Sequence, residues 1–243
     1  MAATMPMYAM PEPGARLAVR PRPASWDAAG HPSQVRLEEF LADAARVCAP
    51  RLDQLPDPLA LRLDVAIPVR TPLLDQHDLD NYLLPLATHL SRTSGRRFVS
   101  VWGTKRHALD SYLAVAEAMP ADANAWHGQA FDVRTTAAAD TTAFKEQIDQ
   151  QLTEATLLPE GPLRLHIAFL VGSRRQWPNL WKPTIDALGR LLGGTTPDRL
   201  WHPRDGRIVE LGLSTRIDPS LGHHVALRIQ IAPADTPATA RPS

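Results

Sequence analysis

The sequence is poor in the features that assign most chains to a class. Of its 243 residues only Cys48 is a cysteine, so neither an internal disulfide nor a cysteine-rich metal site can form, as expected in a reducing compartment. No apolar run approaches the roughly 18 residues that a membrane-spanning helix needs, and residues 1–14 lack the charged and apolar regions of a signal peptide. We therefore expect a cytoplasmic protein with no membrane partner, in which Cys48 is a small buried hydrophobe.

An excess of charge of one sign is also missing. The 26 lysines and arginines balance the 26 aspartates and glutamates, which argues against binding to nucleic acid by bulk charge alone. A local basic face remains open, because net charge does not describe how charge is distributed. The sequence has no glycine-rich phosphate loop, no G-x-S-x-G and no HExxH, which argues against an NTPase, an α/β-hydrolase and a zinc hydrolase.

The most informative feature that is present is a segment that occurs twice. Residues 79–90 read LDNYLLPLATHL and residues 177–188 read WPNLWKPTIDAL, and aligning Asn81 with Asn179 also aligns a proline and a leucine. Each copy follows a similar apolar run, LRLDVAIPV in the first case and LRLHIAFLV in the second. A repeat of this kind sets the expected fold before any single motif does. It predicts two units of roughly 110 residues each.

Hydrophobic periodicity predicts a similar order of strands and helices in the two copies. Helices are expected over 35–48, 81–91, 141–155 and 179–192. Strands are expected over 17–21, 61–69, 98–102, 130–134, 163–171, 208–214 and 224–232, while 103–118 could be strand or helix. This mixture predicts an α/β fold, an α+β mixed sheet with packed helices. The expected divisions are a disordered leader 1–14, a first unit 15–122, a second unit 126–234 and a disordered tail 235–243.

Two carboxylates precede the first asparagine. Asp78 and Asp80 are separated by one residue, so in an extended segment their side chains would point the same way. Close carboxylates repel each other, and a hard divalent ion such as Mg²⁺ is the usual compensation. A polar loop with Asx turns is the alternative. The second copy has Gln176 and Pro178 at these positions.

The second copy carries polar residues that the first copy lacks. On a helix, Asn179, Lys182 and Asp186 would lie on one face. The simpler alternative is a surface ion pair between Lys182 and Asp186, with Asn81 and Asn179 acting as helix N-caps.

Taken together, these pieces resemble the RusA-like Holliday junction resolvases, whose D-x-D-N-x-x-K segment continues to a helical Asp-Ala-Leu and a later W-x-D-D-x-Q-V stretch. DLDN at 78–81 matches the opening, and NLWKPTIDAL at 179–188 matches the continuation. LWHPRDGRIVEL at 200–211 resembles the last piece, with Asp205 at its late aspartate. Neither copy is complete, since the first has Leu84 at the position of the lysine.

The resemblance implies a Mg²⁺-dependent, structure-selective endonuclease that cuts branched DNA in recombination and repair. The implied catalytic residues are Asp78, Asp80, Lys182 and Asp205, and the implied metal ligands are Asp78, Asp80 and Asp205. The candidates for nucleic-acid binding are Asn81, Lys105, Arg106, Asn179, Arg204 and Arg207, with Arg174 and Arg175 as further phosphate contacts. Four tryptophans surround the motifs, Trp102, Trp177, Trp181 and Trp201, and we expect most to pack in the core and one or two to stack on bases.

The expected assembly is two tandem RusA-like units forming an intramolecular pseudo-dimer, or a homodimer of such chains. A site shared by the two units requires the loop 70–80 to approach the helix 179–192 and the loop 202–206. The alternative function is a catalytically inactive RusA-like module that binds nucleic acid or another protein. A third hypothesis is an unrelated structural or interaction protein in which the repeated segment reflects helix capping.

Overall fold

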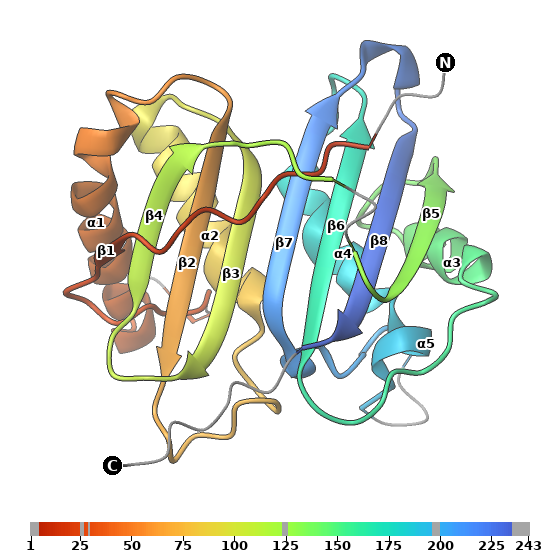
Figure 1. Cartoon of the computed structure of the whole chain (residues 1–243), viewed down its shortest axis with the longest axis horizontal. Helices are drawn as coiled ribbons and strands as arrows, with labels where there is room; N and C mark the ends of the chain where they lie inside the picture. The colour runs from red at the N-terminus through yellow and green to blue at the C-terminus, as the bar shows by residue number, and fades with distance from the viewer. Residues whose placement is uncertain (1–4, 25–26, 29, 123–125, 196–199, 235–243) are drawn as a thin grey trace.

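The computed structural model of the chain describes residues 5–24, 27–28, 30–122, 126–195 and 200–234. Its centre is one eight-stranded mixed sheet with the order β1-β4-β2-β3-β7-β6-β8-β5 (Figure 1). The strands are β1 (Ala15–Arg16), β2 (Leu59–Ile67), β3 (Phe98–His107), β4 (Tyr112–Glu117), β5 (Gln129–Thr135), β6 (Leu163–Val171), β7 (Ile208–Ile217) and β8 (Val225–Pro233). The helices of the described residues are α1 (Pro32–Leu52), α2 (Leu79–Ser94), α3 (Thr142–Gln151), α4 (Trp181–Asp186) and α5 (Gly189–Leu192), with short 3-10 turns η2 (Trp177–Leu180), η3 (Asp205–Arg207) and η4 (Pro219–Leu221). The predicted mixed α/β fold is confirmed.

Strand pairing follows one pattern on both sides of the centre of the sheet. β2 pairs parallel with β3 and antiparallel with β4, while β6 pairs parallel with β7 and antiparallel with β8. β3 and β7 pair antiparallel and so join the two parts of the sheet. Both parallel pairs have a register shift at their first residue, at Leu59/Ala60 and at Leu163/Arg164. By these shifts Leu59 of β2 corresponds to Leu163 of β6, whereas the sequence alignment pairs Leu61 with Leu163. The two alignments differ by two residues, so a given side chain lies on the same face of the sheet in both.

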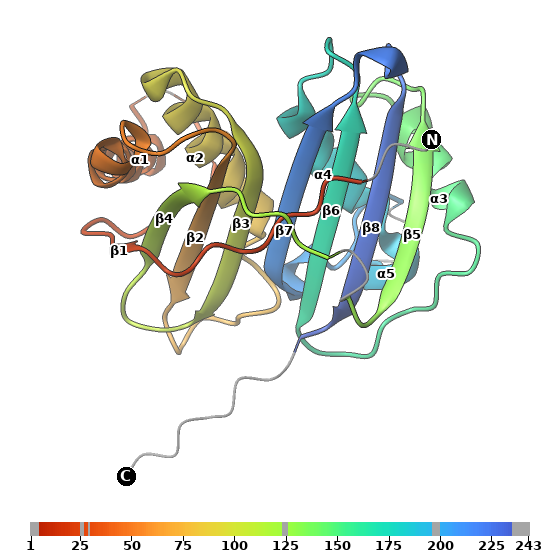
Figure 2. The ribbon, with the colours of Figure 1, turned by 45° about the horizontal axis from the view of Figure 1, so that its top comes forward.

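The helices α1, α2 and α4 cover one face of the sheet, and the N-terminal segment crosses the other face (Figures 1 and 2). The helices bury large side chains against the sheet, and Phe40, Leu86 and Trp181 are fully buried. α2 packs closely on β3 at Gly103, where a Cβ would lie 3.0 Å from the side chain of Leu83. No helix in the described part of the chain is long and apolar enough to cross a membrane.

Residues 5–14 belong to the expected disordered leader, yet the structure gives them partners. Tyr8 forms a β-bridge with Pro120, and the Ala9 amide donates to the Met119 carbonyl at 2.8 Å. Met7 is only 7% exposed. Backbone pairing and apolar burial therefore hold this part of the segment, while residues 1–4 and the expected tail 235–243 lie outside the described residues.

Three predictions for the local structure differ from what is observed, and prolines account for the first. The helix expected over 179–192 is divided into η2, α4 and α5, and Pro178 and Pro183 remove backbone donors at its start. The N-caps of α2 and η2 are Asp78 and Gln176, so neither Asn81 nor Asn179 is an N-cap. The ambiguous region 103–118 contains the end of β3 and all of β4.

Pro85 lies inside α2 because the helix begins at Leu79, earlier than predicted. A proline has no N–H, so the carbonyl of Asn81, four residues earlier, loses its helical donor. The backbone amide of Ala24 donates to this carbonyl at 2.7 Å. The segment before α1 thus replaces the missing helical hydrogen bond.

Candidate active site

Antiparallel pairing of β3 with β7 brings the loop before α2 next to the turn before β7. Lys105, near the end of β3, is 3% exposed and donates from Nζ to the carbonyls of Gln76, His77 and Gly206 at 2.9, 3.1 and 2.6 Å. One side chain therefore ties together two segments that are far apart in sequence.

The same two segments touch through their backbones. A Cβ on Gly206 would lie 2.6 Å from the carbonyl oxygen of Leu74 and 3.0 Å from the carbonyl carbon of Asp75, so only a glycine fits there without a shift. The loop 70–80 therefore approaches the loop 202–206, as a site shared by the two predicted units requires.

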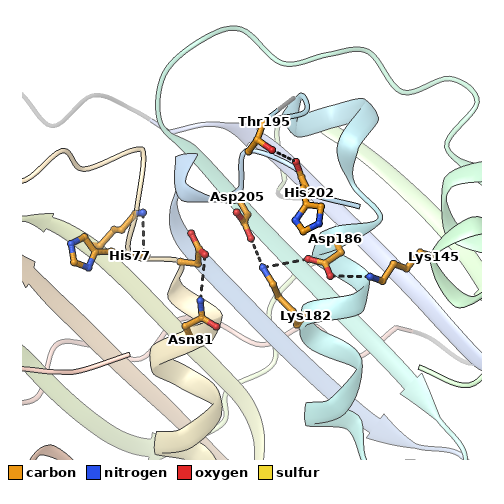
Figure 3. A network of polar contacts seen from close by, with 10 residues as sticks. His77, Asn81, Lys145, Lys182, Asp186, Thr195, His202 and Asp205 are labelled. Carbon is orange, nitrogen blue, oxygen red and sulfur yellow. Dashed lines mark hydrogen bonds and ion pairs between the residues drawn. The ribbon is translucent and has the colours of Figure 1, made fainter. Parts of the chain in front are cut away.

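Lys182 lies at the centre of an ion-pair network (Figure 3). Its Nζ is 2.5 Å from Oδ2 of Asp205 and 3.3 Å from Oδ1 of Asp186, whose other oxygen is 3.2 Å from Nζ of Lys145. The side chains of Asp186 and Asp205 are about 15% exposed and that of Lys182 is 42% exposed. Lys182 therefore has the most exposed side chain of this network.

Asp78 and Asp80 stand at the start of α2, and they do not form the extended pair expected from the sequence. Asp78 is the half-buried N-cap and accepts from Nδ2 of Asn81 at 3.3 Å, while Asp80 lies in the first helical turn and is 4% exposed. The helix begins between the two acids, so their side chains do not point the same way as they would in an extended segment.

Burial and like charges shift the pKa values of these acids. Burial raises the pKa of Asp80 to about 7; the Lys182 ammonium opposes this shift, and the carboxylates of Asp205 and Asp78 add to it. Burial and the Asp205 carboxylate also raise the pKa of Asp78. Acids from the start of α2 and from the turn before β7 therefore lie close enough to repel each other.

The two lysines of the cluster shift in opposite directions. Burial acts to lower the pKa of Lys182, but the carboxylates of Asp80, Asp205 and Asp186 outweigh it and raise the value. Burial lowers the pKa of Lys105 to about 8, against the pull of the nearby carboxylates. Lys182 is thus the main cation of the cluster.

The donor chemistry of this cluster fits Mg²⁺, since carboxylate oxygens are the ligands that this ion prefers. Buried acids with raised pKa values also lack full compensation by a cation. In the described residues, however, no group of three acids, histidines or cysteines is close enough to hold one ion. In this arrangement Lys182 neutralises Asp205, so an ion shared with Asp205 would compete with the ammonium.

Two of the residues predicted to bind nucleic acid have structural partners instead. Lys105 is buried and donates to three carbonyls. Arg207 is 1% exposed and donates to the carbonyls of Gly161, Leu192 and Pro159. As placed, neither side chain can reach a phosphate, because each is enclosed by the carbonyls that it satisfies.

The other four candidates for nucleic-acid binding are more accessible. Arg204 forms a two-point ion pair with exposed Glu160 at 2.6 and 2.9 Å. Arg106 and Asn179 are exposed, and Asn81 is half-buried against Asp78. Arg106 and Arg204 thus keep the exposure that a phosphate contact needs.

Two members of the cluster were not assigned to the site from the sequence. Asp186 belongs to the Asp-Ala-Leu motif, which was a usable signal, whereas Lys145 in α3 carries no motif. A cavity of about 590 Å³ opens beside Asp186 and is lined also by Trp201 and His202. The cluster is therefore reachable from a hollow in the surface.

The tryptophans divide as expected between core and surface. Trp181 is fully buried and Trp102 is 6% exposed, with its ring centroid 4.7 Å from that of His166. Trp177 and Trp201 are partly exposed. Of these four, Trp177 and Trp201 keep part of their surface exposed, and base stacking by either remains a prediction.

No protein-family model matches the chain, and no curated protein matches it.

Proposed function

We propose that this protein is a structure-selective DNA endonuclease that resembles the RusA-like Holliday junction resolvases and acts on branched DNA in recombination or repair. The observation that carries the proposal is the composite cluster. Asp78 and Asp80 come from one copy of the repeated segment, and Lys182 and Asp205, which pair at 2.5 Å, come from the other. The charges of Lys182 and Asp205 both shift the pKa of Asp80. This supports the proposal that one motif is divided between the two copies.

The composition of the cluster suits cleavage of a phosphodiester. Lys182 has a partly exposed side chain, and its ammonium would neutralise a phosphate. Asp80, with a pKa of about 7, can take or release a proton near neutral pH. Mg²⁺ is proposed as the cofactor, with Asp78, Asp80 and Asp205 as its ligands, which requires the three carboxylates to move closer together and Asp205 to release Lys182. When bound, the ion would supply charge neutralisation at the phosphate and polarise a water.

The proposal also assigns an assembly. The two parts of the chain would be tandem RusA-like units that form an intramolecular pseudo-dimer across the β3–β7 pair. The matching pattern of parallel and antiparallel pairs in the two parts supports this assignment. A homodimer of the whole chain is the alternative assembly.

Cleavage of a four-way DNA junction tests the function. The wild-type protein should cut the junction with Mg²⁺ and not with EDTA, and Asp80→Asn should reduce cutting by at least about 100-fold, as is typical when a positioned acid–base group is removed. Arg36→Gln, an exposed change on α1, is the matched control. Junction binding without cutting, unaffected by Asp80→Asn, would refute the endonuclease.

One observation favours the second candidate, a catalytically inactive module that binds nucleic acid or protein on the same scaffold. Lys182 is paired with Asp205 at 2.5 Å, and no described group of three acids, histidines or cysteines could hold one ion. On this hypothesis the cluster only stabilises the contact between the two segments. Mg²⁺ would then neither raise the melting temperature nor support cutting.

A further inference from the structure

A second hollow lies at the other end of α2, in a place that corresponds to the acid cluster when the two parts of the sheet are exchanged. The acid cluster is built from the start of α2, the end of β3, the start of β7 and the side of α4. The second hollow is built from the segment leading into α4, the end of β7, the start of β3 and the side of α2. It has a volume of about 740 Å³, within the range typical of ligand sites.

The charge of this hollow is opposite to that of the acid cluster. Five arginines line it, Arg92, Arg97, Arg174, Arg175 and Arg216, and no aspartate or glutamate is among its described lining residues. Gln176 and Pro178, which stand where the first copy has its acids, belong to the same wall. A hollow with this lining attracts anions, and phosphate in particular.

Four of the arginines are free to bind a ligand. Arg175 donates to the carbonyls of His223 and Ala137 and so holds the wall in place. Arg92, Arg97, Arg174 and Arg216 are exposed and, within the described part of the chain, make no hydrogen bond or ion pair. Their guanidinium groups therefore remain available to a ligand anion.

The wall also contains buried polar atoms that lack partners. Thr215 is 5% exposed and Trp181 is fully buried, yet neither Oγ1 of Thr215 nor Nε1 of Trp181 has a hydrogen-bond partner in the described structure. Buried polar atoms are nearly always paired. Both residues line the hollow, but protein atoms cover these two polar atoms, so the exposed arginines and not these atoms carry the binding.

An aromatic surface completes the hollow. Trp177 is partly exposed, and its ring packs edge-on against Trp181 at a centroid distance of 4.8 Å, which fixes its orientation. A fixed, partly exposed indole is a stacking surface for a nucleobase. Phosphate donors beside such a surface match a nucleotide unit. A base must leave the duplex stack before it can lie against the indole, which favours a single strand.

We infer that the arginine-lined hollow binds a single DNA strand without cutting it, through its phosphates on Arg92, Arg97, Arg174 and Arg216 and one base on Trp177. The inference rests on the proposed function for the identity of the polymer. The hollow has arginines and no acids, so it holds the strand while the acid cluster acts on another part of the same DNA.

Strand binding by the full-length protein in EDTA tests the inference, with fluorescence anisotropy of a fluorescein-labelled single strand at several salt concentrations. Arg174→Gln/Arg216→Gln should weaken binding by at least about tenfold, since two charged contacts are lost. The slope of log K against log salt should fall by about 1.4, or about 0.7 for each contact. Arg36→Gln is the matched control, and melting temperatures verify folding.

The ligand is identified by competition and by tryptophan fluorescence. The strand should quench fluorescence in the wild type and not in Trp177→Phe, and inorganic phosphate or a deoxynucleoside monophosphate should compete only weakly. Equal affinity for the mononucleotide and the strand would overturn the strand assignment. Unchanged binding and salt slope in Arg174→Gln/Arg216→Gln would overturn the site.

The two proposals fail in different ways. If Arg174→Gln/Arg216→Gln weakens strand binding but the wild-type protein never cuts a junction, the endonuclease is contradicted and the hollow is supported. A protein that cuts normally and binds DNA equally well without Arg174 and Arg216 contradicts the hollow alone.

Discussion

At the scale of single residues, burial decides which charges are structural and which can act. Lys105 and Lys182 border the same group of acids, yet one is enclosed by carbonyls and the other keeps 42% of its side chain exposed. The sequence offers no way to tell them apart, because the carbonyls around Lys105 come from loops that meet only when β3 pairs with β7. A basic residue near a motif is therefore weak evidence for a phosphate contact.

The first residue-scale prediction concerns pH. Burial raises the pKa of Asp80 from 3.8 to about 7, so between these values the folded state binds more protons than the unfolded state and stability falls as pH rises. Asp80→Asn has no proton to lose there. In urea unfolding, the stability of this variant relative to wild type should be higher at pH 8 than at pH 4.

Asp53→Asn, at an exposed position, is the control for that comparison. A difference between Asp80→Asn and wild type that stays the same from pH 4 to pH 8 would show that the Asp80 carboxyl does not resist ionisation.

The second residue-scale prediction concerns the lysine that ties the two loops. Lys105→Met leaves three carbonyls without their donor and should lower the free energy of unfolding by about 1–3 kcal/mol. Exposed Arg106→Gln should change it by less than about 0.5 kcal/mol. If Lys105→Met unfolds at the same urea concentration as wild type, the contacts of Lys105 do not stabilise the fold.

At the scale of elements, the β3–β7 pair is the only strand pairing of the described residues that joins the two parts of the sheet. We call the β3–β7 pair the seam. Here the ring of Trp102 of β3 packs over Gly212 of β7 and contacts His166 of β6, so one large ring covers a residue without a side chain. Burial lowers the pKa of His166 to about 3, and the neutral ring is paired with Ser214 at 2.8 Å. The seam is thus packed and uncharged at this point.

A pair of glycine substitutions tests that packing. A Cβ at position 212 would lie 2.6 Å from the Trp102 ring, so Gly212→Ala should destabilise the protein by about 1–3 kcal/mol. Gly189→Ala in α5 meets no atom within 4 Å and should stabilise by up to about 1 kcal/mol, since alanine favours helix. Equal effects of the two changes on urea unfolding would contradict this description of the seam.

The two central strands β2 and β6 were the easiest elements to predict, for a physical reason, whereas the strand expected over 17–21 is not formed. β2 and β6 are almost fully buried, so they form unbroken apolar runs that stand out in the sequence. The helix expected over 179–192 breaks because Pro178, Pro183 and Gly189 interrupt it, although its apolar periodicity continues. The early start of α2 depends on Ala24, whose amide compensates for Pro85, and no local pattern shows that contact.

At the scale of the whole molecule, the net charge is zero, but the acid cluster and the arginine-lined hollow carry opposite charges at the two ends of α2. From Asp78 to Arg92 the chain rises about 20 Å along α2, since each residue adds about 1.5 Å. This exceeds the screening length of about 8 Å at physiological salt. The acid cluster and the arginine-lined hollow should therefore bind their ligands independently.

Thermal shifts test this independence. Mg²⁺ should raise the melting temperature of wild type and of Arg174→Gln/Arg216→Gln but not of Asp80→Asn. A single DNA strand should raise the melting temperature of wild type and of Asp80→Asn but not of Arg174→Gln/Arg216→Gln. The effects of the two groups of substitutions on stability should add within about 0.5 kcal/mol. A loss of the Mg²⁺ shift in the arginine variant would contradict independent sites.

The antiparallel seam has a further consequence for how such a molecule can change. In a pair of identical chains, any substitution is copied to both ends of the shared interface, so the two ends must remain alike. Here different residues of one chain form the two ends of the β3–β7 pair. Asp78 and Asp80 lie at one end, and Gln176 and Pro178 lie in the corresponding place at the other. Each end can therefore acquire its own chemistry by single mutations, without altering the other end.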